Sequence, residues 1–330
     1  MKLNRYFIDH ILFLFPLLFI ECKGGTPQEP EFLLRASLLT NEQHTQTKAF
    51  QYFEKILWER SGGRIKLETY PAEQMAKEIE AIRLIQAGVI DIAVTGSLLN
   101  NWIEIAAFCE LPFLLRDSTD MLTLINGSVG KRIEKEILEK TGLRIVGYFE
   151  AGARHLTSNR PIRHPDELNG LIVRVPSVPS FVTAWGALGA KPTPMAYSEV
   201  FISLQQGTIE AQENPLATIK AGGFAEVQQY VNMTGHVISW VYPVIGEKQF
   251  QRFPDDLKEI FLEAAQDMQE YEHQLFLEGS QTVKNELEAA GMEFIEVDKT
   301  AFIEKAQGDI YHSLSPEMQA VYDEVIEQIR

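Results

Sequence analysis

Cysteine and basic residues are both scarce in this chain. Only two cysteines occur among 330 residues, so a disulfide framework or a zinc site of four thiolates is excluded by count. Lysine and arginine number 30 against 46 aspartate and glutamate residues, which gives a formal charge of -16. Nucleic acids and anionic membrane surfaces are bound through excess basic charge, so we expect neither as a general partner. A negatively charged ligand would need a local basic pocket.

Catalytic signatures are also missing from the sequence. It contains no G-x-x-x-x-G-K-[ST] phosphate loop, no G-x-S-x-G elbow and no H-E-x-x-H metal motif, and its seven histidines are scattered singly. We therefore expect no enzyme, no cofactor and no metal site. Two alternatives stay open. One is an enzyme that orients a carboxylate substrate with arginines, with His155 as base, and the other is an interaction lipoprotein that binds no small molecule.

The one long apolar run lies at the N-terminus. Residues 11–20 form a run of signal-peptide length that is too short to span a bilayer comfortably. We expect residues 1–21 to be a signal peptide and 22–30 to be a polar tether. Cys22 is the predicted lipidated residue, although Glu21 is larger than the residue that usually precedes a lipidated cysteine. The protein should then be periplasmic and held at a membrane only through its lipid.

The remaining sequence predicts an α/β fold in two lobes. Short β-branched or apolar runs alternate with longer segments of helical period, which indicates largely parallel strands. A length of 330 residues favours two compact lobes over one. We expect residues 31–151 with 238–280 to form lobe I, and 152–237 with 281–330 to form lobe II, joined by a hinge. A helical stretch over 254–291 would be long enough to span both lobes.

Arginines gather in one part of this acidic chain, at positions 154, 160, 163 and 174. The planar fork of arginine matches a carboxylate through two parallel hydrogen bonds. Arg174 lies inside the apolar run Leu-Ile-Val-Arg-Val, where a buried charge needs a partner. That partner is either the carboxylate of a ligand or one of the many acidic side chains of the chain itself. The residues alone do not decide between these two.

Several ordered segments, from Phe32 to the C-terminus, resemble the solute-binding proteins of TRAP transporters, the tripartite ATP-independent periplasmic systems, of the dicarboxylate-binding (DctP) type. The resemblance implies a periplasmic-binding-protein-like fold whose cleft captures a small organic acid. It further implies delivery of that acid to the small and large permease subunits in the membrane, and we expect a monomer. The matching segments are LIVRVP at 171–176, ALGAKPTPM at 187–195, SEV at 198–200, LQQG at 204–207 and QENP at 212–215.

The resemblance also implies which residues contact the ligand. Arg174, in the R-V-P strand, matches the arginine that grips the ligand carboxylate, and Asn214, in Q-E-N-P, matches an asparagine that assists it. Arg154, in G-x-R-x-x-T-S-N-R, would line the site, and Tyr197, before S-E-V, would pack on the ligand. The other expected ligand-binding residues are Ser177, Gly96 and Trp240.

Three positions depart from the sialic-acid-binding members of that family. Leu39, Gly96 and Trp240 stand where those members carry polar groups. We therefore expect a monocarboxylate with a rather apolar remainder, then a small dicarboxylate, and not sialic acid. Arg160 and Arg163 should serve the surface or the structure.

Overall fold

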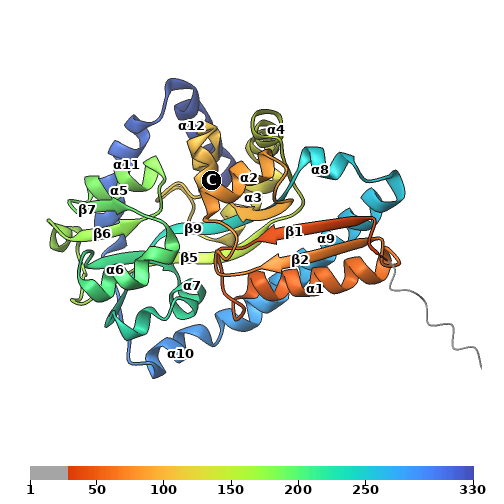
Figure 1. Cartoon of the computed structure of the whole chain (residues 1–330). Helices are drawn as coiled ribbons and strands as arrows, with labels where there is room; N and C mark the ends of the chain where they lie inside the picture. The colour runs from red at the N-terminus through yellow and green to blue at the C-terminus, as the bar shows by residue number, and fades with distance from the viewer. Residues whose placement is uncertain (1–28) are drawn as a thin grey trace, which may run out of the picture.

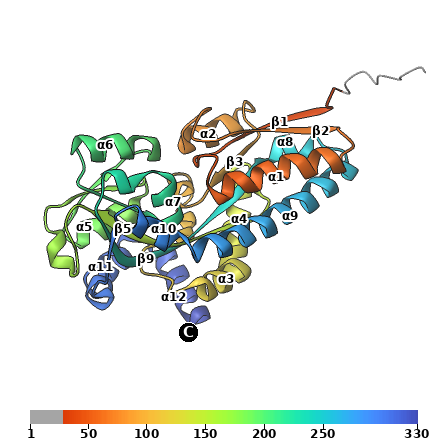
Figure 2. The ribbon, with the colours of Figure 1, turned by 90° about the horizontal axis from the view of Figure 1, so that it is seen from below.

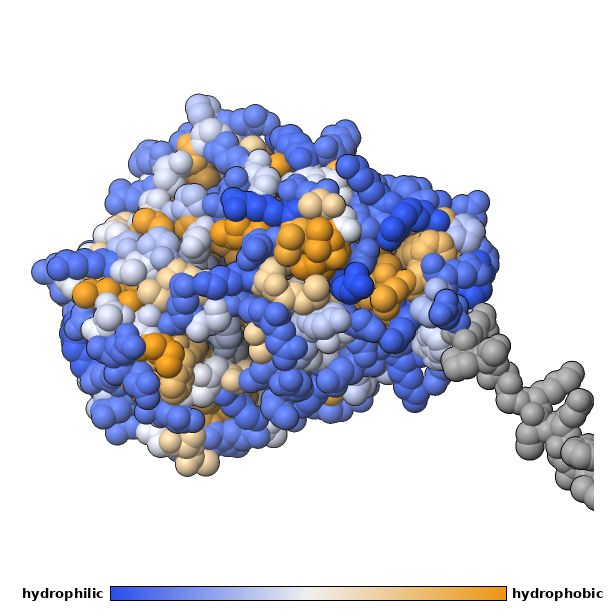
Figure 3. Space-filling model, in the orientation of Figure 1, coloured by the Kyte–Doolittle hydropathy of each residue, from blue (hydrophilic) through white to orange (hydrophobic). Residues whose placement is uncertain are grey.

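The structure is a computed structural model that describes residues 29–330 (Figure 1). The predicted signal peptide over 1–21, Cys22 and the tether up to residue 28 lie outside the described residues. Strands and helices alternate along the described chain, with helices on both sides of the strands (Figures 1 and 2). The face seen in Figure 3 is mostly hydrophilic, with apolar side chains in separate patches, as the acidic composition leads one to expect.

A mixed sheet of ten strands runs through both lobes. Its path is β2, β1, β3, β9, β5, β8, β6 and β7, and β4 and β10 each pair with β9. The strands are β1 (Phe32–Ser37), β2 (Ile65–Tyr70), β3 (Ile92–Thr95), β4 (Leu143–Ile145), β5 (Phe149–Ser158), β6 (Ile172–Val175), β7 (Lys191–Pro194), β8 (Ala211–Pro215), β9 (Tyr230–Gly246) and β10 (Glu293–Ile295).

Strand direction differs between the ends and the middle of this sheet. β1 is parallel to β2 and β3, and β6 is parallel to β7 and β8. In the middle, β9 is antiparallel to β3 and β5, and β5 is antiparallel to β8. The expectation of largely parallel strands therefore fits the two outer groups but not the centre. The reason is that β5 carries the chain from one lobe to the other and β9 carries it back.

The pairing of β5 with β9 is irregular at two places. The register shifts between Glu150 and Gly152, and again between Arg154 and Leu156. Such shifts bend a strand and increase its local twist. Gly152 has φ +81°, a conformation that favours glycine, and a Cβ there would meet the ring of Phe276. The two crossing strands are thus bent where they pass between the lobes.

Twelve helices of α type are found among the described residues. The long helix α9 packs along α1 and reaches β5. The last helix, α12, packs on α3 and α4, which precede the crossing at β5. The helices are α1 (Thr45–Arg60), α2 (Glu78–Gln86), α3 (Ser118–Asn126), α4 (Ser128–Thr141), α5 (Pro179–Ala187), α6 (Val200–Gln206), α7 (Leu216–Ala221), α8 (Glu247–Gln251), α9 (Asp255–Ser280), α10 (Val283–Ala289), α11 (Lys299–Ser313) and α12 (Pro316–Ile329).

The helical stretch expected over 254–291 is two helices rather than one. α9 has 26 residues, about 39 Å at 1.5 Å per residue, and it ends before α10 begins at Val283. At the break, the backbone N–H and the hydroxyl of Thr282 both donate to the carbonyl of Gly279, at 3.1 and 3.2 Å. A threonine hydroxyl that competes for backbone groups and a glycine in the last turn both weaken helix continuation.

The apolar core lies on both faces of the sheet. Between α1 and α9 it contains aromatic rings that meet edge to face, such as Phe53 and Phe261, whose centroids are 5.3 Å apart. On the other face, Trp185 and Trp240 belong to one large cluster that includes residues of both lobes. This shared core fixes the strands that border the space between the lobes.

Candidate functional site

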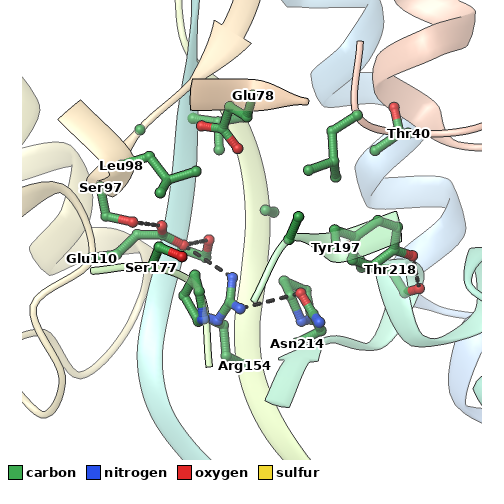
Figure 4. A pocket seen from close by; sticks show the side chains of 18 of the residues that line it. Thr40, Glu78, Ser97, Leu98, Glu110, Arg154, Ser177, Tyr197, Asn214 and Thr218 are labelled. Carbon is green, nitrogen blue, oxygen red and sulfur yellow. Dashed lines mark hydrogen bonds and ion pairs between the residues drawn. The ribbon is translucent and has the colours of Figure 1, made fainter. Parts of the chain in front are cut away.

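A cavity of about 220 Å³ lies between the lobes, beside the crossing strands β5 and β9. Its lining comes from segments far apart in the sequence, including the turn after β3, the start of α2, and strands β5, β6 and β8. Figure 4 shows Arg154 and Asn214 on one side of the cavity and Glu78 reaching in from the other. Six of the seven expected ligand-binding residues line it, namely Arg174, Asn214, Arg154, Tyr197, Ser177 and Gly96.

Trp240 is not part of the cavity lining, which corrects the expectation for this residue. Its side chain is fully buried in the core, edge to face with Tyr242. Successive side chains of a strand point to opposite faces, and its neighbours Ser239 and Val241 line the cavity. The prediction therefore selected the right strand but the wrong face.

Arg174 is a buried cation without an acidic partner among residues 29–330. It is 4% exposed. Its Nε and Nη2 donate to the carbonyl of Met195 at 3.1 and 2.7 Å, and no described carboxylate forms an ion pair with it. Burial lowers the pKa of Arg174 to about 10, and the nearby Arg154 adds to this, whereas Glu213 opposes it. A buried charge in this state is costly until an anion arrives.

Arg154 is, by contrast, held by internal partners. Its Nε and Nη2 donate to both carboxylate oxygens of Glu213, at 2.7 and 2.8 Å, and its Nη1 donates to Glu110 at 3.2 Å. Burial opposes the charge of Arg154, but the two carboxylates outweigh it and raise the pKa. Burial likewise opposes the charge of Glu213, yet Arg154 and His236 hold its pKa at about 2. Arg154, which was expected to line the site, therefore forms an internal salt bridge, and Arg174, for which that alternative was left open, does not form one with any described residue.

Asn214 and Tyr197 are fixed by hydrogen bonds at the edge of this network. The amide of Asn214 donates to Gln212 Oε1 at 2.6 Å, and its oxygen accepts from Arg154 Nη2 at 3.2 Å. The Tyr197 hydroxyl donates to the carbonyl of Thr218 at 3.1 Å, and its ring packs against Phe224. Burial raises the pKa of Tyr197 to about 12, so it keeps its proton at neutral pH.

Several acidic residues in the cavity wall were not predicted from the sequence. Glu78, at the start of α2, accepts a hydrogen bond from Thr95 Oγ1 at 2.8 Å, and burial raises its pKa to about 8. Glu110 accepts hydrogen bonds from the hydroxyls of Ser97 and Ser239. With 46 acidic residues in the chain, no local sequence signal distinguishes these glutamates from surface ones.

The cavity wall carries polar groups beside the apolar surface that Leu39 led us to expect. Leu39 does line the cavity, and Gly96 brings only backbone to it. Around them, however, are hydroxyl, amide and carboxyl groups that can bond a hydroxylated ligand. These polar neighbours are Thr40, Gln46, Glu73, Glu78, Ser97, Glu110, Ser177, Thr218 and Ser239.

Two further features are absent from residues 29–330. No group of three or more histidine, cysteine, aspartate or glutamate side chains there could hold a metal ion. None of the helices described is both long enough and apolar enough to cross a membrane.

A two-lobed α/β fold, with a cavity between the lobes that is lined by a buried arginine without an acidic partner among the described residues, is typical of a solute-binding protein. Residues 36–323 match the family model described as bacterial extracellular solute-binding protein, family 7 (DctP). The chain belongs to this family, and the predicted resemblance to TRAP solute-binding proteins is confirmed. It is a periplasmic binding component of transport and not an enzyme.

Similar proteins agree with this assignment over most of the chain. A solute-binding protein of Roseobacter denitrificans is 41% identical over 298 residues, which cover 90% of this chain and 92% of that protein. The 2,3-diketo-L-gulonate-binding periplasmic protein YiaO of Escherichia coli is 31% identical, covering 82% and 83%. A crystal structure of a TRAP solute-binding protein from Roseobacter denitrificans, with bound L-galactonate, has a TM-score of 0.88 at 40% identity, covering 91% of this chain and 100% of the other.

Proposed function

We propose that this protein captures a sugar acid, an open-chain polyhydroxy monocarboxylate, in the cavity between its lobes. The observation that carries the proposal is Arg174, a buried guanidinium at the cavity with no acidic partner among residues 29–330. The ligand carboxylate would supply the missing anion through a two-pronged pairing with the guanidinium. Hydroxyl groups of the ligand would bond the polar wall around it. The L-galactonate bound by the Roseobacter protein is a ligand of this class.

The remaining cavity residues have distinct roles in this proposal. Asn214 would hydrogen-bond the ligand beside Arg174, and the ring of Tyr197 would pack against its carbon chain. Ser177 and the backbone at Gly96 would bond hydroxyls. Arg154, already held by Glu213 and Glu110, would position Asn214 rather than grip the carboxylate. Trp240 has no contact with the ligand.

Ligand capture would close the two lobes about β5 and β9. The expected division was residues 31–151 with 238–280 and 152–237 with 281–330. Because α12 packs on α3 and α4, we place α12 with the first lobe and keep the rest of the division. Contacts across the cleft support a closed form: Lys77 and Glu199 form an ion pair at 2.7 Å. In addition, the Asn101 amide donates to the carbonyl of Ser177 at 3.0 Å. A ligand stabilises the closed form only through contacts that the open form lacks.

The closed protein would then pass its ligand to the small and large permease subunits of a TRAP transporter. The family assignment supports this partner. The predicted lipid on Cys22 would keep the protein near that membrane, and one acyl chain alone would anchor it weakly. The intact mass of protein extracted from membranes tests the anchor, and an unmodified mature protein that starts elsewhere would contradict it.

The purified protein is first unfolded and refolded to remove any ligand that it carries from the expression host. Calorimetry and thermal shift then test which class of ligand it binds. The panel contains L-galactonate, L-gulonate, a short dicarboxylate, an apolar monocarboxylate and sialic acid. We expect the two sugar acids to raise the melting temperature most, because binding to the native state alone stabilises it. Tighter binding of the apolar acid would refute the sugar-acid assignment. No response to any acid would favour the ligand-free interaction lipoprotein.

A further inference from the structure

One wall of the cavity is formed by the segment between β2 and α2 and by the start of α2. Ala72 and Glu73 in this segment both have positive φ, 52° and 55°, a backbone conformation that residues other than glycine rarely adopt. Their N–H groups donate to the carbonyls of Thr40 and Leu38, each at 2.9 Å. These two bonds hold the segment against the end of β1, so Glu73 has a fixed place at the cavity.

Glu73 has a buried carboxylate oxygen that no described group satisfies. Its Oε2 is buried and has no hydrogen-bond partner among residues 29–330, although Glu73 lines the cavity. Buried polar atoms in native proteins are nearly always hydrogen-bonded. A ligand with a hydrogen-bond donor at this position would supply the missing partner.

Glu78 adds a second carboxyl group to the same wall. Figure 4 shows its side chain directed into the cavity, across from Arg154 and Asn214. One oxygen accepts from Thr95 Oγ1. The cavity therefore has an arginine side formed by β5, β6 and β8 and a glutamate side formed by the β2–α2 segment.

We propose that Glu73 and Glu78 are specificity residues that select a ligand with one carboxylate and a hydroxylated far end, and that reject dicarboxylates. This rests on the proposed function, because it assumes that the carboxylate lies at Arg174. Hydroxyl groups can donate to the glutamate oxygens. A second carboxylate has no proton to donate, so it would leave the buried Oε2 of Glu73 without a partner and would itself lose hydration at this wall. The small dicarboxylate considered from the sequence is thereby disfavoured.

The test compares two ligands that differ only at the far end. L-galactonate has a hydroxymethyl group there, and galactarate has a second carboxylate. Titration calorimetry at neutral pH measures both acids with the wild type, Glu78→Gln, Glu73→Gln and Glu80→Gln. Glutamine keeps the size of the side chain and the oxygen that accepts from Thr95 in Glu78→Gln. Glu80 lies exposed on the same helix as Glu78 and outside the cavity lining, so Glu80→Gln is a control with the same change of side chain.

We expect the wild type to prefer L-galactonate by about 100-fold, which is near the upper end of the loss expected when one buried hydrogen-bonding group is left without a partner. Glu73→Gln should narrow that preference by roughly tenfold, Glu78→Gln should narrow it less because the wild-type side chain already holds its proton at neutral pH, and Glu80→Gln should leave it unchanged. Equal binding of both acids by the wild type would overturn the selection while leaving the sugar-acid function intact. An unchanged preference in both cavity variants would also overturn it. Binding of neither acid would refute the sugar-acid function itself, and this inference with it.

Discussion

The two buried arginines of the cavity lie on strands of the same sheet, but their surroundings are opposite. Arg154 on β5 has a two-pronged pairing with Glu213 and a further bond to Glu110. Arg174 on β6 bonds only the carbonyl of Met195. The pKa of Arg154 is accordingly raised, and the pKa of Arg174 is lowered to about 10 by burial.

This difference separates structure from function within one cavity. The charge of Arg154 is already balanced, so its loss would leave two buried carboxylates unpaired. The charge of Arg174 is balanced only when a ligand is present, so its loss would remove affinity instead. The two arginines have the same residue type and are both buried, so neither property distinguishes their roles. The presence of an acidic partner at Arg154 and its absence at Arg174, among the described residues, does distinguish them.

The largest expected effect is on folding, from Arg154→Ala. Removing one member of a buried ion pair typically costs about 3 to 5 kcal/mol, because the other member stays buried and charged. We expect the free energy of unfolding of the unliganded protein to fall by that amount in urea denaturation. Arg160→Ala removes an exposed arginine a few residues away and should change little. Similar stabilities for the two variants would contradict a structural role for Arg154.

Arg174→Ala should instead abolish most ligand binding. The expected loss is about 2 to 5 kcal/mol, or roughly 30-fold to several thousand-fold in affinity. Arg174→Lys should also bind poorly, because an ammonium cannot reproduce the planar fork. Calorimetry with L-galactonate measures both. If Arg174 serves only to bind the ligand carboxylate, the melting temperature of the unliganded variant should be unchanged or higher. A lower melting temperature with intact ligand binding would assign Arg174 to the fold.

The same contrast between paired and unpaired buried charge extends to the carboxyl groups, and pH should reveal it. Glu213 is paired and has a pKa of about 2, so its contribution to stability is present above its ordinary pKa and is lost as pH falls toward 2. Glu272 on α9 is buried with only Thr45 as a hydroxyl donor, and burial raises its pKa to about 8. The native protein therefore keeps this proton up to about pH 8, whereas the unfolded chain releases it near its ordinary pKa.

The free energy of unfolding should consequently fall as pH rises from about 4.5 to 8, and Glu272→Gln should remove the part of that decline that is due to Glu272, whereas the part due to Glu78 should remain. We expect the variant to be more stable than the wild type by about 2 to 4 kcal/mol near pH 8, and the two to converge near pH 5. Urea denaturation across this pH range measures it. Glu263→Gln, at an exposed position of the same helix, is the control. Parallel pH profiles for wild type and Glu272→Gln would contradict the raised pKa.

The smallest effect is expected at the exposed ion pair that bridges the cleft. Lys77 and Glu199 are each about half exposed, 49% and 51%, and such pairs contribute little and are screened by salt. Glu199→Gln should weaken L-galactonate binding roughly two- to fivefold at low salt, and the difference should vanish at high salt. A large, salt-independent loss would instead place Glu199 in direct contact with the ligand.

Sequence reasoning located one side of the cavity much better than the other. Arg174 and Asn214 could be placed because they lie in short, distinctive motifs on strands. Glu73 and Glu78 could not be placed in the cavity from the sequence, because a glutamate lines a cavity only after distant segments of the chain have folded around it. Trp240 was assigned to the wrong face because the phase of a long strand with register shifts is not readable from composition. The helix break after Ser280 depends on a single threonine and glycine in an otherwise continuous pattern.

The return of the chain through β9 also has a consequence for how the protein is made. Strand β3 ends at Thr95, but its neighbour in the sheet is the stretch Tyr242–Ile245 of β9. Until almost 150 more residues have been synthesised, β3 presents an unpaired edge, which is the kind of edge that recruits other chains. The first lobe therefore cannot finish folding as it leaves the ribosome. Its folding is completed only by a late, long-range strand pairing, which is slow by nature. The nascent chain therefore stays incompletely folded long enough for other proteins to bind it.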